Sequence, residues 1–198
     1  MTSHDAPRYT IRSATEIDVP QILDIYRYYV ANTTIALMLY EPNKDYIASR
    51  LRSTIERKLP YIVAAAGADK DGSPEHVLGY CHVSPFSPDK SGYRHSVELT
   101  LYLQPDYLSV GIGSALLSAV LEQLRSAPYV SWESGQEDKT EKKSQIQVRK
   151  VYAIMSTDVA GRGGWIAKGE KTKEWYVKKF GFKEAGRLNG VGEKFEVR

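Results

Sequence analysis

The chain has 198 residues with a formal net charge of +3, and 42% of its residues are hydrophobic. These values are typical of a globular domain with a single sizeable core. A net charge this small does not argue for nucleic-acid binding, although it suits a polyanionic ligand. No hydrophobic run approaches the ~20 residues of a membrane span, and residues 1–10 lack the apolar stretch of a secretory signal. We therefore expect a cytoplasmic protein without membrane or nucleic-acid partners.

The first half of the chain predicts alternating strands and helices. In order, we expect a loose tail at 1–8, a strand at 9–14, a helix from 19 to about 32, a helix at 44–58, and strands at 61–66 and 77–84. Asp18 is the expected N-cap of the first helix, and the charged residues of the second are expected to be mostly in solvent. Cys81 is the only cysteine, and its strand context predicts a core thiol in a reducing compartment.

The most informative stretch is residues 98–117. Leu99, Leu101 and Leu103 alternate with polar residues that begin at Glu98, which is the pattern of a strand with two different faces. Pro105 then ends the strand, and two glycines precede an apolar run rich in helix formers. The stretch predicts a strand, a glycine turn and a helix N-terminus.

Such a turn is suited to binding phosphate. The first N–H groups of a helix have no acceptor within the helix and lie at the positive end of its dipole, and glycines let a phosphate approach the backbone. A diphosphate could therefore bind the N–H groups around Val110–Ser114. A turn without any ligand is the alternative, because the motif is short.

Three known phosphate-binding signatures contain a turn of this kind. The P-loop needs Lys and Ser/Thr after its second glycine, where the chain has Ser114 and Ala115, and the dinucleotide fingerprint needs a third glycine, where it has Leu116. The GNAT acetyltransferase signature, Arg/Gln-x-x-Gly-x-Gly/Ala, matches at Gly111 and Gly113 but has Leu108 at its first position.

The second half of the chain is less regular. Residues 128–147 are polar and aperiodic, which predicts a disordered or mobile insertion, and residues 159–171 predict a second, glycine-rich insertion. Around these we expect strands at 148–157 and 182–189, a helix at 173–180 with Gly181 just past its end, and a last strand from 195.

Residues 84–117 resemble the phosphinothricin acetyltransferase branch of the GNAT superfamily. The matching positions are Phe86, Tyr93, Arg94, Ser96, Val97, Glu98, Tyr102, Pro105, Gly111, Gly113 and Leu116. The resemblance extends over most of residues 9–195, apart from the two insertions. It implies a single domain over 9–198 with the α/β GNAT fold: a mixed, mostly antiparallel sheet of six to seven strands flanked by about four helices.

The family implies transfer of an acetyl group from acetyl-CoA to the amine of a small molecule, an amino acid or an analogue resembling phosphinothricin. Glu98 then becomes the general base, directly or through a water, and a structural carboxylate paired with Arg94 or His95 is the alternative. The family's general acid aligns with Val177, so the neighbouring Tyr176 either serves in that role or is a core residue. Family members are often dimers, which makes a homodimer possible here.

The resemblance also implies the residues around both substrates. The expected cofactor contacts are Leu101, Tyr102, Leu103, Leu108, Ser109, Val110, Gly111, Ile112, Gly113, Ser114 and Asp158, with a strand N–H near Tyr102–Leu103 holding the reaction's oxyanion. The expected acceptor contacts are Phe86, Tyr93, Arg94 and His95. No metal is expected.

The chain departs from the family at three points. Leu108 stands in place of Arg or Gln, Asp158 in place of Asn, and the final strand is expected to be short, ending at Arg198. Two other functions therefore stay open: a protein or polyamine acetyltransferase, and a catalytically weak binding module with this fold.

Overall fold

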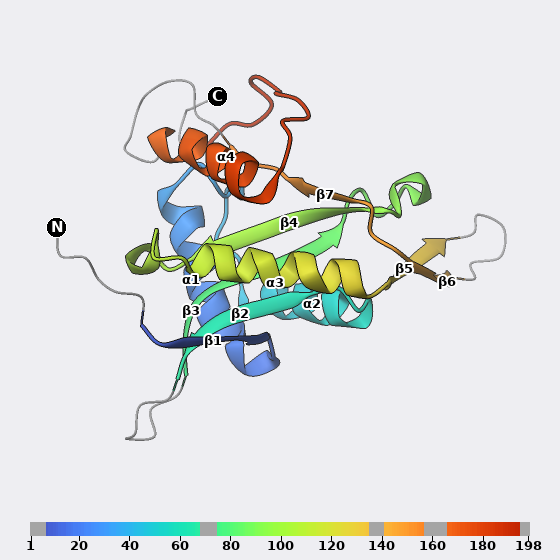
Figure 1. The fold of residues 1–198 in the computed structure, drawn as a ribbon, viewed down its shortest axis with the longest axis horizontal. Helices are drawn as coiled ribbons and strands as arrows, with labels where there is room; N and C mark the ends of the chain where they lie inside the picture. The colour runs from blue at the N-terminus through green and yellow to red at the C-terminus, as the bar shows by residue number, and fades with distance from the viewer. Residues whose placement is uncertain (1–6, 68–74, 135–140, 157–165, 195–198) are drawn as a thin grey trace. The chain divides into compact units, whose positions relative to one another are not determined.

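The computed structural model describes residues 7–67, 75–134, 141–156 and 166–194 (Figure 1). These residues fall into two compact units, which we describe separately. The first lies within residues 1–25 and 42–154, and the second within residues 26–41 and 155–198. The predicted cofactor contact at residue 158 and the predicted strand from 195 lie outside the described ranges.

A five-stranded sheet forms the centre of the first unit. Its strands are β1 (Tyr9–Ser13), β2 (Tyr61–Ala66), β3 (His76–Pro85), β4 (Ser96–Leu103) and β7 (Lys150–Ala153), in the order β1-β2-β3-β4-β7. All neighbours are antiparallel except β4 and β7, which are parallel. The predicted mixed, mostly antiparallel sheet is thus confirmed, with five strands instead of six or seven among the described residues.

Helices cover the sheet of the first unit. Helix α3 (Ile112–Ser126) packs on β1–β4 and crosses them on the near side in Figure 1. Its apolar stripe is fully buried at Ile112, Leu116 and Leu117, as expected for a helix that faces a sheet. Helix α2 (Lys44–Glu56) packs on β2 and β3 and begins at Asn43, whose side chain accepts a hydrogen bond from the Tyr46 N–H.

The predicted N-cap at Asp18 is wrong. Helix α1 (Val19–Asn32) follows a single 3₁₀ turn (Glu16–Asp18), and the Asp18 carboxylate instead accepts a hydrogen bond from the Thr15 N–H at 2.8 Å. Arg12 donates to both oxygens of this buried carboxylate at 2.8 Å. Burial alone would raise the pKa of Asp18, but the hydrogen bonds from Arg12 and Thr15 outweigh it, and the pKa is lowered.

The predicted disorder at 128–147 is also wrong for the residues that the structure describes there. Strands β5 (Tyr129–Ser134) and β6 (Glu141–Ile146) form an antiparallel two-stranded sheet. The average polarity of the segment concealed a short run of aromatic and β-branched residues, which favours a strand. Tyr129 is buried and its hydroxyl donates to the carbonyl oxygen of Arg94, so the ribbon is anchored to the rest of the unit.

The second unit contains helix α4 (Ile166–Phe180), which begins seven residues earlier than the expected 173. Gly181 follows it with a φ of +70°, as predicted, and its N–H donates to the Val177 carbonyl oxygen at 3.2 Å. Residues 182–189 do not form the expected strand, because they are mostly exposed and offer no buried face. The predicted strand at 148–157 is shortened to β7 in the first unit.

A buried lysine fixes the N-terminal part of the second unit. The Lys194 ammonium donates hydrogen bonds to the carbonyl oxygens of Val30 and Ala36. Val30 lies in the last turn of α1, where carbonyl oxygens lack N–H donors within the helix. Burial lowers the pKa of Lys194. Among the described residues, the structure contains no helix with the length and apolarity needed to cross a membrane.

Candidate active site

Strand β4 separates two environments. Leu101 and Leu103 point toward α3, because a Cβ added to Gly113 of that helix would lie 3.8 Å and 3.5 Å from their side chains. Since side chains alternate along a strand, Glu98, Thr100 and Tyr102 point to the opposite face. The alternation predicted from the sequence is therefore confirmed.

The glycine turn at the end of β4 has the backbone conformation that phosphate binding needs. After a 3₁₀ turn (Pro105–Tyr107), Ser109 has a φ of +66° and Gly111 a φ of +93°, and α3 begins at Ile112. The Gly111 carbonyl oxygen accepts the Ser114 N–H at 3.0 Å. The earlier N–H groups of the helix have no acceptor within it. A Cβ on Gly111 would have no neighbour within 4 Å, so this side of the turn is open.

The predicted cofactor contacts are brought together in part. Leu108–Ser114 form this turn, and Leu101–Leu103 form the end of the strand that leads into it. Leu108, which stands in place of the expected Arg or Gln, is half-buried. The turn fits a diphosphate through its backbone, and its helix start supplies the donors. Asp158 lies outside the described residues.

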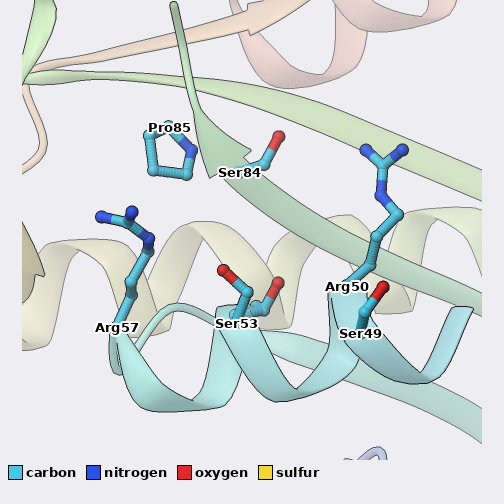
Figure 2. A pocket seen from close by; sticks show the side chains of 7 residues that line it. Ser49, Arg50, Ser53, Arg57, Ser84 and Pro85 are labelled. Carbon is cyan, nitrogen blue, oxygen red and sulfur yellow. The ribbon is translucent and has the colours of Figure 1, made fainter. Parts of the chain in front are cut away.

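A cavity of about 320 Å³ lies between α2 and β3. Its walls carry two guanidinium groups, hydroxyl groups and one proline ring, contributed by Ser49, Arg50, Ser53, Thr54, Arg57, Ser84 and Pro85. Figure 2 shows Arg50 on α2 and Arg57 just past its end, with Ser53 between them and Ser84 facing them from β3. Ser84 pairs with Glu98 across β3 and β4. Side chains of directly opposed residues share one face, so Glu98 lies on the face of this cavity.

Buried aromatic rings lie on the same face of the sheet, next to Ser84 along β3. His82 stacks on Tyr61 with ring centroids 4.4 Å apart, and Tyr80 stacks parallel to it at 6.2 Å. Burial and the nearby charge of Arg50 lower the pKa of His82 to about 3, so the imidazole is neutral at physiological pH. Cys81, next to it, is buried as predicted, and burial raises the pKa of its thiol.

Phe86 and Tyr93, two of the predicted acceptor contacts, lie side by side. Their rings pack edge to face at 5.4 Å, and Phe86 also packs on Tyr152 at 4.9 Å. Tyr152 of β7 pairs with Glu98, so it belongs to the same face. A smaller hollow that shares Arg57 and Pro85 with the cavity is lined by Phe86, Tyr93 and Arg94, and by Trp132 of β5, among others.

The other two predicted acceptor contacts have clear structural partners. His95 Nδ1 lies 2.9 Å from the Gln147 carbonyl oxygen, which can only accept, so Nδ1 carries the proton. Arg94 donates to the Ser91 carbonyl oxygen at 3.2 Å. Both residues therefore help to fix the loop that precedes β4.

Tyr176 belongs to the second unit. Its ring packs edge to face on Trp175 at 4.7 Å and on Phe182 at 5.2 Å, and 8% of the residue is exposed. Val177, the position that matches the family's acid, is 41% exposed. Aromatic packing accounts for the surroundings of Tyr176.

Sequence reasoning missed the arginines of the cavity. The charged residues of the helix expected at 44–58 were predicted to be mostly in solvent. This holds for Arg52 and Glu56 but not for Arg50 and Arg57, which are half-buried. The available signal was their spacing of seven residues, which places both on one face of a helix. Tyr152 and Ser84 carried no sequence signal, because only strand pairing brings them to Glu98.

The comparisons identify the class of protein. The acetyltransferase (GNAT) family matches residues 23–143. This is more than half of the chain, and the chain belongs to that family. The match confirms the resemblance drawn from the sequence.

Two of the individual relatives carry the name of the phosphinothricin branch. The chain is 28% identical over 120 residues to the phosphinothricin N-acetyltransferase of Alcaligenes faecalis, covering 61% of this chain and 57% of that protein. A Sinorhizobium meliloti phosphinothricin acetyltransferase, solved in complex with AcCoA, is 31% identical with a TM-score of 0.54 over 62% of each chain. A Brucella melitensis ribosomal-protein-alanine N-acetyltransferase is 27% identical with a TM-score of 0.67, over 94% of this chain and 92% of that one.

Proposed function

We propose that this protein is an acetyl-CoA-dependent N-acetyltransferase that acts on a small amine of the amino-acid type. One observation carries the proposal: β4 ends in the glycine turn and also bears Glu98 on the face of a polar cavity. One strand thus connects a diphosphate-binding turn with a carboxylate that faces a space for the acceptor. The names of the relatives support the same acceptor class.

The turn is the part of the chain that would hold the cofactor. Its N–H groups from Val110 to Gly113 would hold the diphosphate of acetyl-CoA, and the positive end of the α3 dipole would add to the attraction. When bound, acetyl-CoA supplies an activated acetyl thioester. Binding through backbone N–H groups also explains how Leu108 can replace a charged or polar side chain.

Glu98 acts as the general base. An α-amine has a pKa of about 8, so much of the acceptor arrives protonated and is not a nucleophile. Glu98 accepts that proton, directly or through a water, while the rings of Phe86, Tyr93 and Tyr152 limit the space around it. Holding the amine in place supplies much of the remaining acceleration.

Tyr176 remains the candidate for the general acid. In this role its hydroxyl would protonate the leaving thiolate. The test is to measure kcat of Tyr176→Phe at saturating acetyl-CoA. A fall in kcat would support the assignment. An unchanged kcat would leave Tyr176 as a packing residue of the second unit, in line with its contacts to Trp175 and Phe182.

A second candidate function is acetylation of a protein N-terminus. The name of the Brucella melitensis relative favours it. A protein acceptor would need only its first residues to enter the site.

A single assay separates these functions. Free thiol release from acetyl-CoA is measured with amino acids and phosphinothricin, with a peptide that begins with alanine, and with a polyamine, using the purified full chain. We expect turnover with amino acids or phosphinothricin. Turnover with the peptide alone would support the second function, and no acetyl-CoA binding by calorimetry at millimolar ligand would overturn both.

A further inference from the structure

The cavity between α2 and β3 has a chemical character that the acetyl transfer itself does not require. Among the described residues that line it there are two guanidinium groups and several hydroxyl groups, and no carboxylate. Guanidinium groups present N–H donors in a planar fork that matches carboxylate and phosphate oxygens. Its walls therefore favour a negatively charged occupant.

The spacing of the arginines suits a small molecule. Arg50 lies on α2, and Arg57 is the residue that directly follows the helix and still has helical φ and ψ. The two are seven residues apart, so they lie on the same side about 10 Å apart along the helix axis. Ser53 lies between them on that side, and Ser84 approaches from β3. The cavity volume of about 320 Å³ is that of a site for a small ligand.

Both arginines are positioned by aromatic residues. The Arg50 guanidinium lies 5.2 Å from the centroid of the Tyr46 ring and donates a hydrogen bond to the hydroxyl of that tyrosine. The Arg57 guanidinium lies 4.0 Å from the centroid of the Trp132 ring. Such contacts keep the side chains in place before a ligand arrives, which reduces the entropy lost on binding.

Trp132 links this cavity to β5. The strand lies in the polar segment for which the sequence predicted disorder, yet its tryptophan packs on Arg57 and lines the smaller hollow next to the cavity. The strand therefore supports one wall of the cavity through Arg57. Trp132 is a positioning residue, because it acts on a ligand through Arg57.

We propose that Arg50 and Arg57 bind an anionic group of the acceptor, a carboxylate or a phosphorus oxyanion, in this cavity, and so restrict the enzyme to acidic amines. The proposal rests on the proposed function in that the occupant is the acceptor. Glu98 lies on the same face, so an acceptor anchored by its acidic group presents its amine to the base. Polyamines lack the group that the arginines bind, and their charge is repelled.

The test measures binding without the cofactor. Glutarate and inorganic phosphate serve as probes for the two kinds of oxyanion, and calorimetry compares the unchanged protein with Arg50→Met, Arg57→Met and the double variant. Arg52→Met is the matched control, because Arg52 lies on the same helix but is exposed and paired with Glu16. We expect the double variant to lose at least ~tenfold in affinity for a probe, and the control to lose less than twofold.

The outcome separates this proposal from the proposed function. If the unchanged protein binds neither probe, or if the double variant binds as well as the control, the anion site is refuted even when acetyl transfer occurs. If anions bind but no amine is acetylated, the proposed function fails and the site stands. Should a methionine variant not fold, Arg50→Lys and Arg57→Lys keep the charge, and we expect each to bind phosphate better than glutarate, which depends more on the planar fork.

A second readout examines specificity. In the Trp132→Leu variant we expect KM for an acidic acceptor to rise ~threefold or more while kcat stays within twofold, because only the position of Arg57 changes. Equal KM values in the variant and the unchanged enzyme would show that Trp132 does not position the arginine.

Discussion

The glycine turn and the α2–β3 cavity both belong to the neighbourhood of β4, and they are built in opposite ways. The turn is one continuous segment, and its donors are backbone N–H groups whose directions are set by the φ values of Ser109 and Gly111. The cavity takes its walls from α2 and β3, and its donors are side chains. A backbone site therefore depends on conformation, whereas a side-chain site depends on which residues the fold brings together.

This difference determines how each site responds to substitution. In the turn, a change of side chain matters only where it alters the backbone or fills the open side. In the cavity and at Glu98, the identity of each charged group matters. The following predictions test that contrast in order of expected effect.

The largest effect is expected at Glu98. Glu98→Gln removes the base but keeps the shape of the side chain, so we expect kcat/KM to fall by ~100-fold or more, as is usual for loss of a general base. Acetyl-CoA affinity, measured by calorimetry, should stay within twofold because the turn is untouched. A kcat/KM within twofold of the unchanged enzyme across pH 7–9 would show that Glu98 is not the base.

Acid should lower the free energy of unfolding through the buried His82. Burial and the charge of Arg50 lower the pKa of His82 to about 3, while an unfolded histidine has a pKa of about 6.5. The unfolded state therefore binds more protons between these values, and the free energy of unfolding should fall by about 1.4 kcal/mol per pH unit below pH 6.5.

Denaturant titrations between pH 6.5 and 4.5 measure that slope. Above about pH 5 the carboxylates, Asp18 among them, stay ionised in the folded and the unfolded states, so the slope measured there is free of their contribution. His82→Phe keeps an aromatic ring in the stack and should remove most of the slope. His76→Phe is the control, because His76 is exposed and should leave the slope unchanged. Equal slopes in both variants would assign the acid sensitivity to other groups.

The next effect concerns Gly111. Its φ of +93° is strained for a residue with a Cβ, at a cost of about 1–2 kcal/mol. Gly111→Val should therefore weaken acetyl-CoA binding by ~tenfold and leave the binding of glutarate in the cavity unchanged. Gly111→Asn is the matched control, because asparagine adopts this conformation more readily. If valine and asparagine have equal effects, the backbone conformation is not the cause.

The smallest effect is expected at Gly113, two residues further. A Cβ there would lie 3.5 Å and 3.8 Å from the side chains of Leu103 and Leu101, which is ordinary contact. Gly113→Ala should therefore change acetyl-CoA affinity less than twofold. It should change the free energy of unfolding by less than ~1 kcal/mol. A loss as large as that of Gly111→Val would mean that the turn depends on both glycines alike.

The sequence by itself determined the parts of this protein that depend on local order. Alternation along β4 and the two glycines after it predicted the strand, the turn and the start of α3, because period, turn conformation and helix start are properties of neighbouring residues. The same stretch carried the resemblance to the GNAT family, which the comparisons confirm.

Only the tertiary structure decided what faces Glu98. Arg50, Ser84 and Tyr152 lie far from one another in the chain, and helix packing and strand pairing bring them to one face. Local composition also predicted disorder where β5 forms, because an average over a polar segment hides Tyr129 and Trp132. The partners of both residues lie elsewhere in the sequence. The glycine turn is thus encoded by adjacent residues, while the cavity exists only once the sheet and α2 have packed.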